Sequence, residues 1–195
     1  MSEKEQMTEV DATPPGPGRL KKTIVMVGMM GAGKTAVGRA LAARLDVPFL
    51  DSDHEIESAA NMTIPEIFAR DGEAFFRLKE RQVISRLLTE ECGVLSTGGG
   101  AFLAAENRET ITRNGASIWL QADLEVLWNR VRHRDTRPLL KTADPRATLS
   151  ELYAARVPLY AKADLAVISD GQASIEEMVD RVLDALKSRP DVLES

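Results

Sequence analysis

From Lys22 onwards, short apolar runs alternate with stretches whose apolar residues recur every three or four positions. The first run, Thr23–Val27, is followed at once by a glycine, which is typical of a strand buried on both faces. Similar runs predict four further strands at 47–50, 93–96, 116–120 and 165–168. The pattern therefore predicts five short strands separated by other elements.

The stretches between these runs carry the signals of helices. One helix is expected to begin at Lys34, and a second follows Thr63, a typical N-cap, with Pro65 in its first turn. Two more are expected at about 73–89 and 174–186. Strands that alternate with helices in this way predict a three-layer α/β fold, in which helices cover both faces of a mainly parallel sheet.

The two ends and one internal stretch break this alternation. Residues 1–21 are acidic and rich in proline and glycine, which predicts a disordered tail rather than a signal peptide. A second tail is expected at 189–195, which leaves one domain at 22–188. Within that domain, the polar and basic stretch at about 133–146 lacks clear periodicity. Loops this long usually act as lids or are disordered, so we expect a mobile lid here.

Composition narrows the classes of partner. The 195 residues carry a formal charge of −5, whereas proteins that bind nucleic-acid backbones need a surplus of Lys and Arg. The one cysteine, Cys92, cannot form an internal disulfide, so a reducing compartment is allowed. No apolar run approaches the ~18 residues that span a bilayer. We therefore expect a cytoplasmic monomer with no nucleic-acid or membrane partner.

The segment Gly28–Thr35 satisfies the P-loop pattern G-x-x-x-x-G-K-[ST]. A predicted strand precedes it and a predicted helix follows, which is the context that this motif requires. Its glycines let backbone N–H groups surround a polyphosphate, and the helix start adds positive potential. Lys34 can then reach the β- and γ-phosphates, and Thr35 can bind Mg²⁺. The alternative is a glycine-rich turn that serves only packing.

A second candidate site follows the second predicted strand, where Asp51, Ser52 and Asp53 lie at the edge of the sheet that binds ligands in α/β folds. The two aspartates are two residues apart, so they point to similar sides of an extended chain. Such a pair can support hydrated Mg²⁺ and accept a proton from an attacking hydroxyl. Aspartates here can equally cap the following helix, and the sequence leaves both interpretations open.

Taken together, the motifs resemble those of the shikimate kinases, a family related to the nucleoside monophosphate kinases. The similarity runs from about Lys22 to Leu186, in matching order and spacing. It rests on Gly28–Thr35, Asp51-Ser52-Asp53, Phe76-Arg77-x-x-Glu80, Ser96-Thr97-Gly98-Gly99-Gly100-Ala101, Arg137-Pro138-Leu139-Leu140, and Arg156 with Tyr160. The triple glycine and the R-P-L-L segment together are more specific than the P-loop.

This resemblance implies a five-stranded parallel sheet, a lid that closes over ATP, and transfer of the γ-phosphoryl group of ATP to the 3-hydroxyl of shikimate, in chorismate and aromatic amino acid biosynthesis. ATP would be bound by Gly31, Ala32, Gly33, Lys34, Thr35, Ala36, Arg130 and Arg137. Shikimate would be bound by Asp53, Arg77, Gly98, Gly99, Gly100 and Arg156. Mg²⁺ would be held by Thr35 and, through water, by Asp51. The catalytic residues would be Lys34, Asp53 and Arg137.

The resemblance also implies finer roles. Arg77 and Arg156 would hold the shikimate carboxylate, with Glu80 orienting Arg77. Arg130 would stack on adenine, and Arg137 would reach over the γ-phosphate from the lid. Arginine suits a carboxylate because its planar guanidinium forms two parallel hydrogen bonds, which lysine does not.

Plainer alternatives remain open from the residues alone. Arg77 can be a surface arginine paired with Glu73 or Glu80 on its own helix. The three glycines at 98–100 can form a flexible turn, and Arg130 can belong to a solvated basic run. The nearest rival function is another small-molecule kinase, such as a gluconate kinase. A rival of a different class is a regulatory module that binds nucleotide without catalysis.

Overall fold

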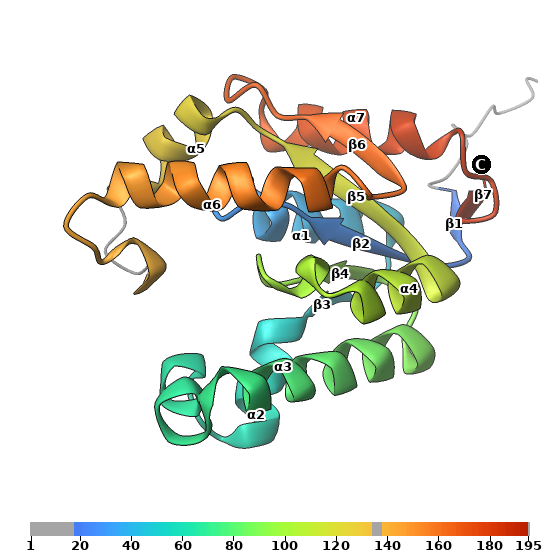
Figure 1. The fold of residues 1–195 in the computed structure, drawn as a ribbon. Coiled ribbons are helices and arrows are strands. Elements are labelled where there is room, and N and C mark those ends of the chain that lie inside the picture. The colour runs from blue at the N-terminus through green and yellow to red at the C-terminus, as the bar shows by residue number, and fades with distance from the viewer. Residues whose placement is uncertain (1–17, 134–137, 195) are drawn as a thin grey trace, which may run out of the picture.

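The computed structural model describes residues 18–133 and 138–194, which form one α/β unit with a short additional ladder at its end (Figure 1). The elements in chain order are β1 (Arg19–Leu20), β2 (Thr23–Val27), α1 (Lys34–Leu45), β3 (Phe49–Asp51), α2 (Ser52–Ala60), α3 (Ile64–Glu90), β4 (Val94–Ser96), η1 (Ala101–Leu103), α4 (Ala105–Asn114), β5 (Gly115–Gln121), α5 (Leu124–Val131), η2 (Pro138–Leu140), α6 (Pro145–Tyr160), β6 (Leu165–Ile168), α7 (Ile175–Leu186) and β7 (Leu193–Glu194).

The main sheet has five parallel strands in the order β3-β4-β2-β5-β6. Strand β2 lies at its centre and is buried along its whole length, with Ile24 opposite Val94 on one side and Ala116 on the other. Because all five strands run the same way, their carboxyl ends meet at one edge, where α/β folds bind ligands. The segments that follow β2, β3 and β4 therefore lie at the same edge.

Helices cover both faces of this sheet. Helices α1 and α7 pack against each other on one face, while α4 packs on β5 from the other face and contacts α3 (Figure 1). Helices α2 and α3 form a pair that projects beyond the sheet, as Figure 1 shows. The predicted α/β fold with a five-stranded parallel sheet is confirmed.

Strand β3 begins later than the pattern of apolar residues predicted. The predicted range was 47–50, but pairing with β4 runs from Phe49 to Asp51. Val47 is not available to the sheet, because its N–H binds the carbonyl of Ala42 at the end of α1. Pro48 has no N–H to donate. The strand therefore carries Asp51 at its last position.

Helix α3 contains a break that separates the two helices predicted from the sequence. Its start has a capping box, in which Thr63 and Glu66 each accept from the other's backbone N–H. Gly72 has φ 84° and ψ 172°, outside the helical range, and a residue with a side chain would be strained there. The break sets the direction of the following segment, which carries Arg77 and Glu80 towards the sheet edge.

Both expected tails contribute ordered residues. Strand β1 pairs with β7 in an antiparallel ladder, so the described fold extends beyond the expected domain limits of 22–188 at both ends. The ladder is anchored by Val192, which is fully buried and accepts a hydrogen bond from the N–H of Lys21. Two-residue strands have no periodicity, so the sequence pattern gave no signal for them. Residues 1–17 lie outside the described residues.

The expected lid is described only in part. Residues 138–140 form η2, in which Leu140 is buried and Leu139 is half exposed. Helix α6 begins at Pro145 with Asp144 as its N-cap, whose side chain accepts from the N–H of Ala147. Residues 134–137 lie outside the described residues, so the mobility of the lid stays a prediction.

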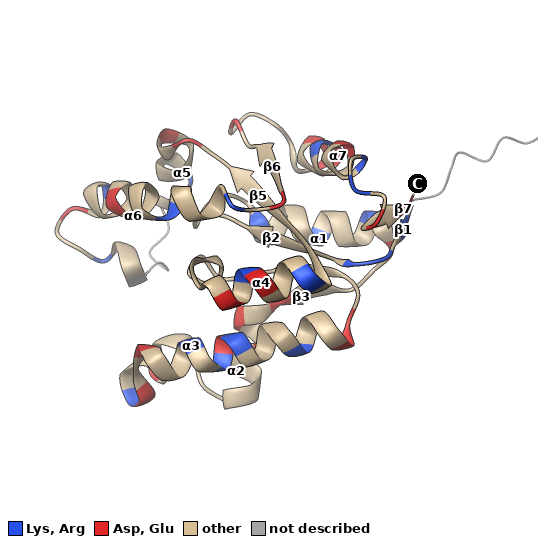
Figure 2. Cartoon of the chain, turned by 45° about the vertical axis from the view of Figure 1, so that its right-hand side comes forward, with Lys and Arg blue, Asp and Glu red and all other residues tan. Residues whose placement is uncertain are grey.

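The outer surface carries mixed charges. In Figure 2, Lys and Arg are interspersed with Asp and Glu along α3, α4 and α7. Many of these side chains pair across elements, such as Arg44 of α1 with Glu176 and Asp180 of α7. Within residues 18–133 and 138–194, every helix is too short or too polar to cross a bilayer.

Candidate active site

The loop between β2 and α1 has the conformation of a phosphate cradle. Gly28, Gly31 and Gly33 have φ values of 145°, 79° and 97°, which residues with side chains rarely adopt. A Cβ at Gly31 would also lie 2.7 Å from a methyl group of Val131. The glycines are therefore required by the turn, and loops of this kind can surround an anion with backbone N–H groups.

The start of α1 leaves its positive end open to an anion. Its N-cap, Gly33, offers no side-chain acceptor, and its first turn contains no acidic residue. The first N–H groups of a helix have no partner within the helix, so they attract a phosphate. Thr35 and Ala36 are exposed in this first turn. The Nζ of Lys34 donates to the carbonyls of Gly28 and Met29 at 2.5 and 3.3 Å, which keeps it folded over the loop.

The two aspartates that follow β3 have different roles in the structure. Asp51 is the N-cap of α2, and its Oδ1 accepts from the N–H of His54 at 3.1 Å. Asp53 lies in the first turn of α2 and faces the segment after β4. Asp51 therefore caps the helix, as one of the two interpretations predicted, with its second carboxylate oxygen not used in the cap, while Asp53 is oriented towards the segment after β4.

The environment of Asp53 favours its protonated form more than water does. Burial is the main cause, and the negative charges of Asp51 and Glu80 add to it, so the pKa of Asp53 is raised to about 6. Lys34 acts in the opposite direction through its positive charge. A carboxylate with a pKa near neutrality is suited to exchange a proton at physiological pH.

The glycine loop, Gly98–Gly100, follows β4 and lies against three charged side chains. Each glycine faces a different one, and each of the three was singled out in the sequence. The pairs are Gly98 with Asp53, Gly99 with Arg156, and Gly100 with Arg77, where an added Cβ would come within 2.8, 2.9 and 2.5 Å of the nearest side-chain oxygen or nitrogen. The structure therefore brings α2, α3 and α6 together around this loop, and a side chain at any of the three positions would displace a charged group.

Arg77 pairs with Glu73 and Glu80 on its own helix, as expected for a surface arginine, but Glu80 is buried. Its Nη1 lies 2.9 Å from Glu80, and its Nε lies 3.6 Å from Glu73. Glu80 is only 1% exposed, and its second oxygen has no hydrogen-bond partner among the described residues. Burial raises the pKa of Glu80, while Arg77 lowers it. A buried carboxylate depends on its partner far more than a surface pair does, so Glu80 fixes Arg77 beside Gly100.

Three residues that the sequence analysis did not assign hold the glycine loop and the η1 segment that follows it. Tyr160, at the end of α6, donates its hydroxyl to the carbonyl of Gly99 at 2.5 Å. From α4, Asn107 donates to the carbonyl of Ala101, and Arg108 donates to the next two carbonyls. The spacing of Arg156 and Tyr160, four residues apart on one helix, was a usable signal for the first of them. Asn107 and Arg108 lie in an ordinary polar helix pattern that gave none.

Arg130 differs from the neighbouring arginines. Its guanidinium donates to the carbonyl of Gly31 at 2.9 Å and to the hydroxyl of Ser169 at 3.2 Å. It therefore joins the phosphate loop to the segment after β6. Among the described residues, the side chain of Arg132 forms a hydrogen bond only with the adjacent His133. Arg137, expected to reach the γ-phosphate, lies outside the described residues.

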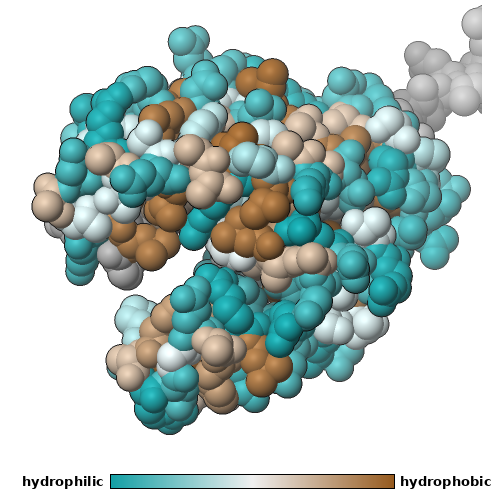
Figure 3. All heavy atoms as spheres, in the orientation of Figure 1, coloured by the Kyte–Doolittle hydropathy of each residue, from teal (hydrophilic) through white to brown (hydrophobic). Residues whose placement is uncertain are grey.

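The space between these groups is open to one side. Figure 3 shows a hollow between the part formed by α2 and α3 and the part that carries α5 and α6. The phosphate loop, Asp53 and the glycine loop all follow strands that end at the same edge of the sheet. An anion on the loop and a small molecule at the glycine loop can therefore lie side by side.

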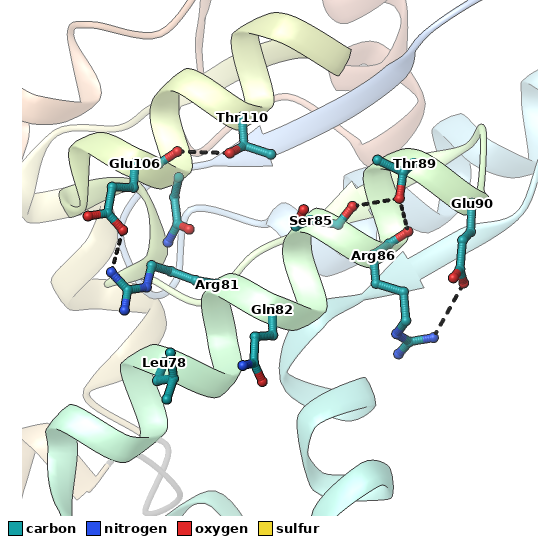
Figure 4. Close-up of a pocket in the computed structure, with 10 residues that line it drawn as sticks. Leu78, Arg81, Gln82, Ser85, Arg86, Thr89, Glu90, Glu106 and Thr110 are labelled. Atoms are coloured by element: carbon teal, nitrogen blue, oxygen red, sulfur yellow. Dashed lines mark hydrogen bonds and ion pairs between the residues drawn. The ribbon is translucent and has the colours of Figure 1, made fainter.

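A different groove lies on the outer surface of α3 and α4. It encloses about 650 Å³, and its charged residues already pair with one another, as Figure 4 shows for Arg81 with Glu106 and Arg86 with Glu90. A phosphate ligand needs cations that are not neutralised by protein carboxylates. This groove therefore lacks the character of a nucleotide site.

The donor set suits a magnesium ion that is bound mainly through substrate and water. Among the described residues, no three His, Cys, Asp or Glu side chains cluster to form a metal cage. Thr35 offers an exposed hydroxyl beside the phosphate loop, and Asp51 uses only one carboxylate oxygen in its cap. Mg²⁺ commonly takes few protein ligands and completes its shell with phosphates and water, so these residues fit it.

Comparison with known proteins gives a consistent result. The family model for shikimate kinase matches residues 30–187. A shikimate kinase of Ruegeria pomeroyi is 74% identical over 92% of this chain and 92% of its own, and one of Cereibacter sphaeroides is 67% identical over 91% and 88%. Among solved structures, shikimate kinase from Acinetobacter baumannii in complex with shikimate has a TM-score of 0.80 and 39% identity, covering 86% of this chain and 93% of that one.

Proposed function

Because this chain belongs to the shikimate kinase family, we propose that it transfers the γ-phosphoryl group of ATP to the 3-hydroxyl of shikimate, giving shikimate 3-phosphate and ADP. The observation that carries the proposal is the glycine loop, where Asp53, Arg77 and Arg156 each lie against a different glycine. Two cations and one carboxylate around a bare backbone suit a small polar acceptor that bears a carboxylate and hydroxyls.

On the acceptor side, Arg77 and Arg156 bind the shikimate carboxylate. Glu80 holds Arg77 through a 2.9 Å contact, so little side-chain freedom is lost on binding. Gly98 to Gly100 bring the backbone close to the ring of the acceptor. Asp53 binds the ring hydroxyls and lies where the 3-hydroxyl is activated.

On the nucleotide side, the loop at Gly31–Ala36 binds the phosphates of ATP through backbone N–H groups. Lys34 exchanges its contacts with the loop carbonyls for the β- and γ-phosphates. Arg130, held by the carbonyl of Gly31 and by Ser169, supports the adenine by stacking. Arg137 reaches the γ-phosphate from the lid.

Phosphoryl transfer has a loose transition state, so most of the catalysis comes from positioning and from neutralising charge. Lys34 and Arg137 offset the charge on the transferring group, and closure of the lid excludes water that would otherwise accept it. Asp53 accepts the proton of the 3-hydroxyl, for which its pKa of about 6 is well placed.

Magnesium is the expected cofactor. Thr35 would bind it directly and Asp51 through a water molecule, and the ion would supply positive charge at the β- and γ-phosphates. We also expect the chain to act as a monomer in the cytoplasm without nucleic acid, and light scattering tests the first of these expectations.

The direct test measures ADP release by the purified chain with Mg·ATP and one acceptor at a time. We expect saturable release with shikimate and only background release with gluconate or AMP. Release with gluconate or AMP but not shikimate would instead indicate a different small-molecule kinase. Binding of ATP with no release for any acceptor would support the regulatory module.

A further inference from the structure

Tyr160 is a fully buried side chain whose hydroxyl reaches the substrate side of the molecule. It is the last residue of α6, and it is 0% exposed. Its ring packs beside Trp119 of β5 with centroids 6.3 Å apart, while its hydroxyl donates to the carbonyl of Gly99 at 2.5 Å. The ring thus belongs to the core and the hydroxyl belongs to the glycine loop.

The guanidinium of Arg156 lies near the same hydroxyl, because both groups surround Gly99. The two residues are four positions apart, so they share one face of α6. Burial raises the pKa of the Tyr160 hydroxyl, and Arg156 partly offsets this through its positive charge and a side-chain hydrogen bond. A Cβ on Gly99 would lie 2.9 Å from Nη1 of Arg156 and 3.7 Å from the hydroxyl of Tyr160. Gly99, Arg156 and Tyr160 therefore form one cluster.

This cluster is different from the other support of the loop. Asn107 and Arg108 of α4 bind carbonyls of η1, after the three glycines, and neither contact involves a group proposed to bind shikimate. The contact from α6 joins the loop backbone to a guanidinium that binds the acceptor. Of these two supports, only the one from α6 sets the position of a substrate-binding side chain relative to the glycines.

We infer that Tyr160 is a positioning residue for shikimate, whose hydroxyl fixes the guanidinium of Arg156 against Gly99 so that both meet the acceptor in one arrangement. This inference rests on the proposed function. A phenylalanine at 160 fills nearly the same volume, so the core keeps its packing. It leaves the carbonyl of Gly99 without a donor and releases Arg156 from one of its contacts.

The first test compares Tyr160→Phe with the unmodified chain. We expect the Kd and KM for shikimate to rise about tenfold, which is the size of one hydrogen bond with a charged partner. The KM for ATP and the Kd for ADP should stay within about twofold, and kcat within about threefold, because the nucleotide site is untouched. An unchanged Kd for shikimate in a folded variant would overturn the inference.

Tyr153→Phe is the matched control. Tyr153 lies on the same helix, is half-buried, and its hydroxyl makes no hydrogen bond with the described residues. Removing it should leave shikimate binding unchanged. An equal loss in both variants would mean that the effect comes from α6 as a whole, and would contradict a specific role for Tyr160.

A double-mutant cycle tests whether Tyr160 acts through Arg156. In an Arg156→Lys background, where the fork that contacts Gly99 is gone, Tyr160→Phe should weaken shikimate binding by less than about threefold. A full tenfold loss in that background would show that the two residues act independently and would overturn the coupling.

A measurement that keeps the hydroxyl covers the case in which Tyr160→Phe fails to fold. The chain has two tyrosines, so Tyr153→Phe protein labelled with ¹³C at tyrosine Cζ gives a single signal from Tyr160. Saturating shikimate should shift this signal, because its carboxylate changes the field of Arg156, whereas ADP should not. No shift with shikimate bound would contradict the inference.

Calorimetry with shikimate on the unmodified chain distinguishes a failure of this inference from a failure of the proposed function. If the unmodified chain does not bind shikimate, the proposed function and this inference are both overturned.

Discussion

The nucleotide half and the acceptor half of the site are built in different ways. The phosphate loop is one continuous segment, Gly28–Thr35, and it acts mainly through backbone groups and the start of α1. The acceptor half takes its side chains from α2, α3 and α6, which come together at the glycine loop. Under the proposed function, the part of phosphate binding that the loop supplies is therefore local in the sequence, whereas binding of the acceptor depends on the tertiary fold.

This difference predicts that substitutions in one half leave binding in the other half intact. Catalysis needs both halves, so a substitution in either can lower kcat. The Kd for nucleotide and the Kd for shikimate then show which half was changed. The largest effects are expected where a group acts only on the transferring phosphoryl, and smaller ones where a group only binds or positions the acceptor.

Arg137→Ala should lower kcat by about 10³-fold, because this residue is expected to meet the γ-phosphate only as charge develops on it. The Kd for shikimate should change by no more than about threefold. Steady-state kinetics combined with calorimetry checks both values. An unchanged kcat would remove Arg137 from this role.

Arg77→Ala should weaken shikimate binding about 10²-fold, since truncating one side of a hydrogen-bonded charge pair costs 2–5 kcal/mol or more. It also leaves Glu80 buried without its partner, so the free energy of unfolding should fall by roughly 3 kcal/mol.

Arg77→Lys separates these two effects. It keeps a positive charge beside Glu80 and loses the planar fork, so we expect most of the stability to return while shikimate affinity stays at least tenfold weaker. Urea unfolding and calorimetry on both variants give the comparison. Shikimate binding at the original strength in Arg77→Ala would contradict the proposed acceptor site.

Gly99→Ala should weaken shikimate binding by roughly 30-fold with little effect on ADP. Its Cβ would lie 2.9 Å from Arg156, whose guanidinium must then move, and a misplaced binding group loses affinity without unfolding the chain. The matched control is Gly72→Ala, which meets nothing within 4 Å and has strain only from its positive φ. If Gly99→Ala binds shikimate as tightly as the unmodified chain, acceptor binding does not depend on how side chains meet at the glycine loop, which would contradict the contrast between the two halves.

The pH dependence of kcat/KM for shikimate should report Asp53. Its raised pKa of about 6 means that the carboxylate form is lost as the pH falls through 6, so kcat/KM should level off about one pH unit above that value, fall to half near pH 6 and be about tenfold lower at pH 5.

Asp51→Asn sharpens this assignment. The charge of Asp51 raises the pKa of Asp53, so its removal should move the midpoint of the profile to lower pH, whatever it does to the maximum rate. A midpoint that stays in place would mean that a group other than Asp53 controls the profile.

The contrast between the halves also explains what the sequence could predict. The phosphate loop, the strand that precedes it and the helix that follows were all predicted, because motif, glycines and periodicity lie within about twenty residues. All five strands were found: β2 and β6 have the predicted boundaries, and the other three differ by one or two residues, as for β3, where Val47 instead closes α1.

The sequence did not show in the same way which distant residues come together in the fold. Nothing in the local pattern around Arg77 distinguishes a helix-surface arginine from one held by a buried Glu80, and only family resemblance suggested a role for it. The supports from Asn107 and Tyr160 depend on how α4 and α6 pack on the loop. The ladder of β1 with β7 is too short to leave a periodic signal.

The central claim is that a carboxylated alcohol at the glycine loop receives the phosphoryl group held on the phosphate loop. Phosphorus NMR of the reaction with Mg·ATP and shikimate tests it most directly, because it shows which atom accepts the group. The account predicts ADP and a phosphate monoester coupled to the proton on carbon 3 of shikimate, in equal amounts. Formation of inorganic phosphate in place of the monoester, or no turnover by folded protein, would contradict it.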